Sequence, residues 1–254
     1  MKVLLSPAKT LNFENNQTIG EGVAPLFIEE AQKVNNKLAK LSGAKLMELQ
    51  KISKDLAKLN RRRNLERDMS SLANTRQAAL AFKGDVYLGM EAEHWSEVDM
   101  QFAIQHLWIL SGLYGLLSPN TLISPYRLEM GTALGIGRKR NLYAFWKDSF
   151  KAYFDANLDP ELPIVNLASK EYAEAVLQLN LANPVIDIEF LDASKGDYKI
   201  LSFFAKKARG MMANYIVQNR LNDWKELKDF NLAGYYYDPS RSKERKLVFL
   251  RDKK

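Results

Sequence analysis

The chain has 254 residues, enough for one large domain or two small ones, and 46% of them are hydrophobic and 26% charged, as in an ordinary globular protein. Lysine and arginine outnumber aspartate and glutamate by 37 to 30, and the formal charge of +7 favours polyanionic partners such as nucleic acid, although solubility alone would also explain it. The chain has no cysteine, which excludes disulfides, thiolate nucleophiles and cysteine-ligated metal centres.

The sequence gives no sign of a metal site, a cofactor or a membrane segment, and we expect none of them. His94 and His106 have no spacing that suits a metal pair, so each is expected to be a single packed or solvated imidazole. The apolar run near the N-terminus ends at Pro7 and is too short for a signal peptide or a membrane span. Together with the lack of cysteine, this predicts a cytoplasmic protein.

The first part of the chain predicts a short strand followed by two helices. Residues 2–5 read as a buried strand that Ser6-Pro7 stops. Apolar residues at steps of three and four predict a helix from Leu26 to Leu41 and another over about 46–62. The second helix carries five cations on one face: Lys51, Lys54, Lys58, Arg61 and Arg62. Such a face suits either a phosphate backbone or plain solvation.

The middle of the chain predicts a helix at 77–82, a turn at 83–85 and a buried apolar segment at 102–110. An ordered loop rich in glycine and proline follows, and then an amphipathic helix that starts at Asn141. Residues 163–169 read as a buried strand before a helix from Lys170. Two antiparallel hairpins are predicted after that, "PVIDIEFLD" with "DYKILSFFA" and "GYYYD" with "KLVFLR".

These elements predict the fold class. Strands alternate with helices early and pair antiparallel late, so we expect an α+β protein with a mixed sheet surrounded by helices. No repeat, low-complexity tract or linker divides the chain, which predicts a single domain over residues 1–254.

The helix "SFFAKKARGMMANY" (202–215) is the strongest candidate for an anion site. Ala208, Met211, Met212, Tyr215 and Ile216 form its predicted buried stripe, and Lys206, Arg209, Gly210 and Ala213 lie opposite, with Lys207 beside them. Cations at the positive end of a helix dipole favour a bound anion, and the small residues would let it approach closely. The alternative is a solvated basic helix start.

Further cations and a glycine pair lie in other motifs. Lys9 follows the first strand, where ligands bind in sheet proteins, but "SPAKT" lacks the glycines of a P-loop. Lys83 lies at a turn beside Asp85. Gly112 and Gly115 resemble the phosphate-holding turn of a helix-hairpin-helix motif, with two intervening residues instead of one.

The acidic residues do not predict a catalytic centre by themselves. Arg127 and Glu129 are two apart in an extended segment, so they point to one side and form either an ion pair or an arginine–carboxylate site. Asp85, Glu129, Asp187 and Glu189 are candidate catalytic carboxylates or Mg²⁺ ligands if folding brings them together. No Ser-His-Asp spacing is present.

Six motifs, in order along the chain, resemble the bacterial YaaA family of peroxide stress proteins. They are "LLSPAKTL", "AFKGDVY", "LSGLYGLLSP", "PYRLEMG", "NLASKEY" and "SFFAKKARGMMANYI". The resemblance implies a single-domain mixed α/β architecture with a helix-hairpin-helix-like element and a basic cleft. It also implies binding to double-stranded or bubble-like DNA, with less free iron and less oxidative DNA damage.

From the matching motifs we expect Lys9, Lys83, Arg127, Lys206, Lys207 and Arg209 to contact DNA phosphates. The leading hypothesis is therefore a non-enzymatic DNA-binding protein of the peroxide stress response. One rival is an enzyme that acts on a nucleic acid or nucleotide with an acidic residue as proton carrier, and another is a direct iron binder. A chain without cysteine cannot reduce peroxide through a thiolate.

Overall fold

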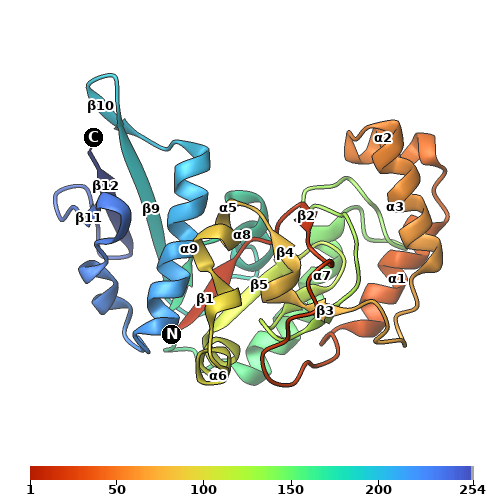
Figure 1. The fold of residues 1–254 in the computed structure, drawn as a ribbon, viewed down its shortest axis with the longest axis horizontal. Helices are drawn as coiled ribbons and strands as arrows, with labels where there is room; N and C mark the ends of the chain where they lie inside the picture. The colour runs from red at the N-terminus through yellow and green to blue at the C-terminus, as the bar shows by residue number, and fades with distance from the viewer. Residues whose placement is uncertain (253–254) are drawn as a thin grey trace.

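The computed structural model describes residues 1–252, and its centre is an eight-stranded mixed sheet with helices packed around it (Figure 1). The strands of this sheet are β1 (Lys2–Leu5), β5 (Leu107–Ser111), β6 (Gly115–Leu117), β8 (Ile164–Asn166), β9 (Val185–Ser194), β10 (Asp197–Lys199), β11 (Tyr235–Tyr237) and β12 (Lys246–Arg251). Two further two-stranded ladders join β2 (Thr10–Leu11) to β4 (Phe82–Lys83) and β3 (Arg76–Gln77) to β7 (Leu122–Ile123).

The α-helices are α1 (Ile28–Ala39), α2 (Gly43–Gln50), α3 (Lys54–Glu66), α4 (Ala78–Ala81), α5 (Asp85–Met90), α6 (Glu97–His106), α7 (Leu142–Asn157), α8 (Lys170–Leu177) and α9 (Ser202–Gln218). Short 3₁₀ turns occupy Ala92–His94, Trp224–Asp229 and Leu232–Gly234. None of the helices in the part of the chain described is long and apolar enough to traverse a lipid bilayer.

The sheet is parallel at its centre and antiparallel at its margins. Its order is β11-β12-β9-β8-β1-β5-β6, in which β1 pairs parallel with both β5 and β8, and β9 pairs parallel with both β8 and β12. The antiparallel partners are β6, β10 and β11. Both predicted late hairpins are present, as β9–β10 and β11–β12, and the mixed sheet surrounded by helices is confirmed.

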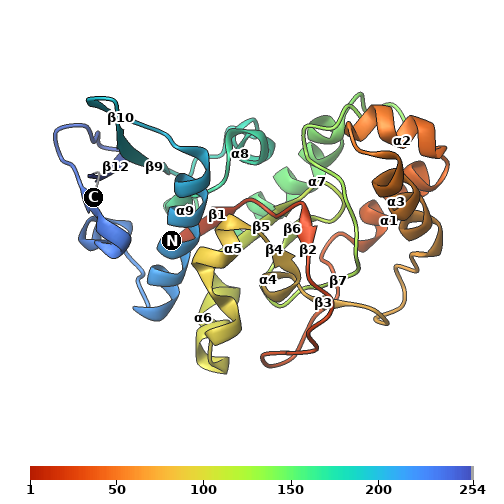
Figure 2. The ribbon, with the colours of Figure 1, turned by 45° about the horizontal axis from the view of Figure 1, so that its top comes forward.

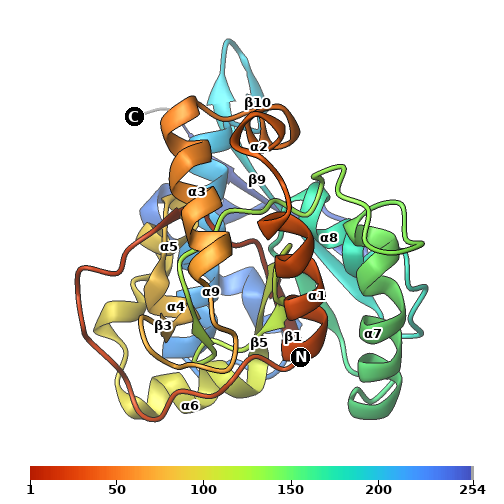
Figure 3. The same ribbon diagram turned by 90° about the vertical axis from the view of Figure 1, so that its right-hand side faces the viewer.

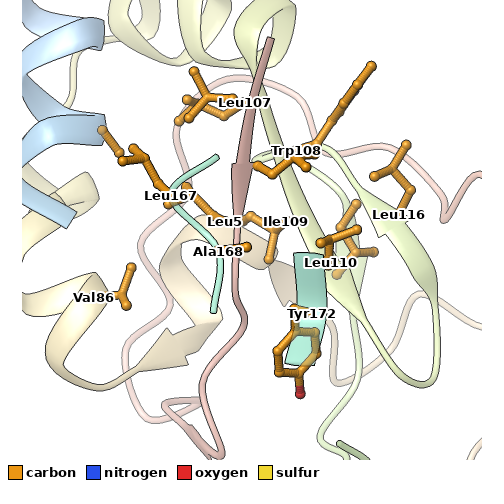
Figure 4. Packing of buried hydrophobic residues seen from close by; sticks show 14 of the residues in the cluster. Leu5, Val86, Leu107, Trp108, Ile109, Leu110, Leu116, Leu167, Ala168 and Tyr172 are labelled. Atoms are coloured by element: carbon orange, nitrogen blue, oxygen red, sulfur yellow. The ribbon is translucent and has the colours of Figure 1, made fainter. Parts of the chain in front are cut away.

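One cluster of buried side chains runs from Met1 to Phe249 and joins the sheet to the helices. Figure 4 shows its centre, where Leu5 of β1 lies between Ile109 and Ala168. Ile109 belongs to β5, and Ala168 follows the end of β8. These three side chains are almost entirely buried. The continuous apolar run of β1 therefore has the pattern of a strand covered on both faces.

Two groups of helices lie at opposite sides of β1. In Figures 1 and 2, α9 lies beside β9 at one side of the molecule, whereas α1, α2 and α3 lie at the other. The β2–β4 ladder lies between the two groups, close to the end of β1. Figure 3 shows α1 and α3 from the side, with the segment that follows β2 forming a wide arc beside α3.

The helix predicted over 46–62 is wrong, because the chain breaks there into α2 and α3. Lys51 takes a left-handed conformation (φ 51°), and the Ser53 hydroxyl then accepts a hydrogen bond from the Leu56 amide and caps α3. The buried side of α3 is made of Ala57, Asn60 and Asn64. The apolar stripe of α2 and the cations of α3 thus belong to separate helices.

Two other boundaries differ from the sequence expectations. The apolar segment 102–110 belongs to two elements, because α6 ends at His106 and β5 begins at Leu107. The second strand of the β9–β10 hairpin is short and ends at Lys199, three residues before α9. In both places the hydrophobic pattern continues across a change of element, so periodicity alone could not locate the boundary.

Close packing of α5 against α9 explains why Gly210 and Ala213 of α9 are small, although the sequence suggested that they leave room for a ligand. A Cβ atom on Gly210 would lie 1.7 Å from the Val86 carbonyl oxygen, and one on Gly89 would lie 2.2 Å from the Lys207 carbonyl oxygen. Gly210 and Ala213 are both buried. The expectation that they leave room for a ligand is therefore wrong: Gly210 lets two backbones meet, and the Ala213 side chain is covered by protein.

Candidate functional site

The carboxyl end of β1 is the point where the strand order of the sheet reverses, and a small pocket lined by Lys9, Arg127 and Glu129 lies just beyond it. The chain goes from β1 to β5 on one side and from β5 to β8 on the other, so the strand order reverses at β1. Ligand sites of parallel sheets lie outside the carboxyl ends of strands at such a reversal. Here the Ser6 hydroxyl oxygen accepts a hydrogen bond from the Ser169 amide (2.9 Å), which joins the ends of β1 and β8.

A carboxylate with two cations lines this pocket. Glu129 Oε1 is 3.1 Å from Arg127 Nη2 and 3.5 Å from Lys9 Nζ. The side chains of Arg127 and Glu129 are only 19% and 16% exposed, whereas that of Lys9 is 64% exposed. The prediction that Arg127 and Glu129 point to one side is confirmed, and Lys9 extends from the same cluster into solvent.

Lys83 is brought next to Lys9 by the small β2–β4 ladder. Thr10, which follows Lys9, pairs with Lys83 across this ladder. Lys83 is exposed, and the following Gly84 is so close to Ala8 that a Cβ on it would lie 3.3 Å from the alanine Cβ. Lys83 therefore lies on the strand that pairs with the segment directly after Lys9, although the two lysines are 74 positions apart in the sequence.

The segment that carries Arg127 and Glu129 is fixed from several sides. Gln50 at the end of α2 donates a hydrogen bond to the Arg127 carbonyl oxygen (2.8 Å), and the Glu171 carboxylate of α8 accepts one from the Gly131 amide (2.8 Å). The group formed by Ser6, Lys9, Lys83, Arg127, Glu129 and Ser169 is called the carboxyl-edge site below. Arg127 and Glu129, its two mostly buried charged members, belong to a loop that α2 and α8 hold in place.

Gly112 lies in the turn between β5 and β6, and Gly115 is the first residue of β6, so the predicted helix-hairpin-helix element is not present at this position. Both glycines are buried, and the Ser111 hydroxyl oxygen accepts a hydrogen bond from the Tyr114 amide. A Cβ on Gly112 would lie 2.5 Å from the Leu128 carbonyl oxygen. Gly112 therefore lets the Arg127–Glu129 segment lie against the turn, and its backbone is covered by protein.

The first turns of α9 present cations, but not all on one exposed face. Lys206 and Lys207 are exposed, whereas Arg209 is half-buried. Burial lowers the pKa of the Arg209 guanidinium, and the nearby Glu189 carboxylate acts in the opposite direction. Among the described residues, Arg209 Nε has no hydrogen-bond partner. Arg209 therefore faces β9 and is a less accessible phosphate ligand than its two neighbours.

The four acidic candidates do not meet in one place. Glu129 pairs with Arg127, Asp187 accepts a hydrogen bond from the Asn166 amide group (2.8 Å), and Glu189 pairs with Lys246 (2.8 Å). Asp85 begins α5. Within residues 1–252 no group of three or more His, Asp or Glu side chains is arranged to hold a metal ion.

A comparison with protein families matches residues 1–241 to the model described as peroxide stress protein YaaA. The chain belongs to the YaaA family. It is also 47% identical over 252 residues to a UPF0246 protein of Cellvibrio japonicus (strain Ueda107), and the alignment covers 98% of each chain.

Three of the YaaA motifs supply most of the carboxyl-edge site. "LLSPAKTL" provides Ser6 and Lys9, "PYRLEMG" provides Arg127 and Glu129, and "NLASKEY" provides Ser169. The motif "AFKGDVY" adds Lys83 through the β2–β4 ladder. Motifs that are far apart in the YaaA sequence thus meet at one edge of the sheet.

Two aromatic residues of the YaaA motif "SFFAKKARGMMANYI" were not identified as site candidates from the sequence. Phe203 and Phe204 are 57% and 40% exposed, and their rings contact each other at the start of α9. The Arg251 guanidinium lies 4.1 Å from the centre of the Phe204 ring. An aromatic pair one residue before two lysines is the sequence signal that could have located them, because aromatic rings beside cations are typical of surfaces that bind unpaired bases.

Proposed function

We propose that this YaaA-family protein binds DNA phosphates through the carboxyl-edge site and the start of α9. The observation that carries the proposal is that Lys9 and Arg127, from two separate segments of the chain, share the Glu129 carboxylate, and that the β2–β4 ladder brings a third cation, Lys83, next to the segment of Lys9. Cations that outnumber carboxylates at the open edge of a sheet favour a polyanion. The formal charge of +7 supports the same partner.

The start of α9 supports a preference for distorted DNA. Lys206 and Lys207 are exposed beside Phe203 and Phe204, so phosphate contacts and base stacking are available within one helical turn or two. Stacking on an aromatic ring requires a base that is free of its partner. A duplex with an unpaired stretch offers such bases next to intact backbone.

DNA binding accounts for a role in peroxide stress without peroxide chemistry by the protein itself. The chain has no cysteine that could be oxidised in a catalytic cycle. A protein bound along the sugar–phosphate backbone shields the DNA from damage caused by iron and peroxide. In this proposal the effect on free iron is indirect.

The test is the salt dependence of DNA binding. The double variant Lys9→Ala/Lys83→Ala removes two phosphate contacts, so the slope of log K against log salt should become flatter by roughly 2. The matched control is Lys147→Ala/Lys225→Ala, which removes the same charge from exposed positions on α7 and the 3₁₀ turn 224–229. Equal slopes for the two double variants would contradict the proposed site.

A second function is favoured by the position of Glu129. This mostly buried carboxylate lies between two cations at the strand ends, which is an arrangement suited to proton transfer on a bound phosphate ester. The test is incubation of bubble DNA with the protein, with and without Mg²⁺, and a search for altered product. Loss of product formation in Glu129→Gln, with DNA affinity retained, would establish the enzyme; no product under any condition would exclude it for this substrate.

A further inference from the structure

A cavity of about 740 Å³ lies beside α3, and none of the residues of the carboxyl-edge site lines it. Its walls come from α3, from the segment around Phe13 that arcs past this helix in Figure 3, and from the chain next to β3 and β7. This volume is in the range of small-molecule sites. Four arginines line it, which are Arg62, Arg63, Arg67 and Arg76, and this group is called the arginine cavity below.

The guanidinium groups of the arginine cavity lack close carboxylate partners. Within residues 1–252, Arg63, Arg67 and Arg76 have no carboxylate oxygen within 4.0 Å, and Arg62 Nε is 3.8 Å from Glu66. The acidic residues in the lining are Glu66 and Asp68, so two positive charges remain in excess. Partly buried cations without counter-charges are costly, and a bound anion would offset that cost.

Two of these arginines are held rigidly by neutral groups. Arg67 donates to Ser124 Oγ (3.1 Å) and to the Pro125 carbonyl oxygen (2.6 Å). Arg76 is only 6% exposed; one of its Nη atoms donates to the Asn12 carbonyl oxygen (2.8 Å), and its buried Nε has no partner among the described residues. These contacts position the groups without neutralising them. Arg63 is half-buried and, among residues 1–252, makes no such contact, so it can turn to a ligand.

The chemistry of the walls indicates which anion fits. Planar guanidinium forks match phosphate oxygens in pairs, which is why arginine is preferred at phosphate sites. Phe13, Leu59 and Leu122 add apolar surface, and Asn74 and Thr75 add amide and hydroxyl groups. We propose that the arginine cavity binds a small phosphorylated molecule of nucleotide size, with its phosphates on the arginines and its ring against the apolar wall.

The experiment is a calorimetric titration of the full chain with ATP. Arg63→Ala should weaken binding about tenfold, because it removes a charged hydrogen-bonding group. Arg63→Lys keeps the charge but loses the fork, so its affinity should lie between those of the natural protein and Arg63→Ala. The matched control is Arg61→Ala, which removes the same charge from the same exposed helix outside the cavity and should leave the affinity unchanged.

Three results would overturn the inference. They are the absence of saturable ATP binding, an equal loss for Arg61→Ala and Arg63→Ala, and displacement of ATP by duplex DNA together with weaker DNA binding by Arg63→Ala. The last result would make the cavity part of a DNA surface. The inference is independent of the proposed function, because Lys9→Ala/Lys83→Ala should change DNA binding and leave the affinity for ATP as it is.

Discussion

Gly210 is the residue at which α9 comes closest to α5, so we expect Gly210→Ala to be strongly destabilising. The added methyl would meet the Val86 carbonyl oxygen at 1.7 Å, and two helix backbones would have to separate. The loss in the free energy of unfolding should be about 3 kcal/mol or more, since backbone atoms cannot rotate away as side chains do. Denaturant unfolding measures it.

Gly43 provides the control for this prediction. It begins α2, and a Cβ there would meet no atom within 4 Å. Gly43→Ala should therefore be neutral or stabilising by up to about 1 kcal/mol, as helix propensity alone predicts. A similar stability for the two alanine variants would mean that α5 and α9 are not in close contact.

His106 should make the stability depend on pH. Burial lowers the pKa of its imidazole, with the N-terminal ammonium and Lys2 acting in the same direction, whereas the contact of Nδ1 with the Met1 carbonyl oxygen (2.9 Å) acts in the opposite direction. The unfolded chain then binds a proton near pH 6.5 that the folded chain does not, so the free energy of unfolding falls as the pH drops through this range. Urea unfolding at about pH 7.5 and about pH 5.5 should show a smaller fall for His106→Gln than for the natural protein.

At the scale of elements, a buried ion pair holds the outer strands together. Asp192 on β9 is 4% exposed, and its carboxylate receives Arg251 Nη2 of β12 (2.5 Å) and the Tyr235 hydroxyl of β11 (3.1 Å). Arg251→Met leaves this carboxylate buried without its cation, so stability should fall by about 3–5 kcal/mol. The double variant Asp192→Asn/Arg251→Met should recover most of that loss.

The control for the buried pair lies on the same two strands. Lys246 of β12 and Glu189 of β9 form a half-exposed pair at 2.8 Å. Lys246→Met should cost at most about 1 kcal/mol, because water already screens this pair. Equal losses in the free energy of unfolding for Lys246→Met and Arg251→Met would show that the burial of Asp192 does not make its ion pair more important for stability. Thermal unfolding followed by circular dichroism measures both.

The elements that were predicted correctly are those whose hydrophobic pattern and terminal residues both lie in the same short stretch of sequence. The strand at 2–5 ends two residues before Pro7, as the sequence predicted. The helix from Lys170 follows Ser169, a residue type that is common directly before helices. The break at Lys51 and Ser53 escaped prediction, because the apolar spacing continues through it. Parallel pairing of β12 with β9 also escaped, since no local pattern identifies a partner strand.

The candidate site shows the same division between local and long-range information. The side shared by Arg127 and Glu129 follows from the alternation of an extended segment and could be predicted. The approach of Lys83 to Lys9 depends on the β2–β4 ladder, and the role of Gly210 depends on the crossing of α5. No local sequence pattern predicts either contact, so only the folded structure shows which small residues and which cations lie next to each other.

At the scale of the whole molecule, cations lie on both sides of the carboxyl edge. Lys206 and Lys207 belong to α9, whereas Lys54 and Lys58 are exposed on α3, in the helix group at the other side of β1 (Figures 1 and 2). Within residues 1–252 none of these four lysines has a carboxylate oxygen within 4.0 Å. A long polyanion placed over the carboxyl edge would therefore meet free cations on each side.

If one duplex contacts both sides, the effects of neutralising them should add. On a duplex of about 20 base pairs, Lys206→Ala/Lys207→Ala should flatten the salt slope by roughly 2, and Lys54→Ala/Lys58→Ala by a similar amount. The quadruple variant should then flatten it by roughly 4, because independent phosphate contacts release independent counterions. A change limited to the α9 pair would show that α3 is a solvated face and that the duplex lies on one side of β1 alone.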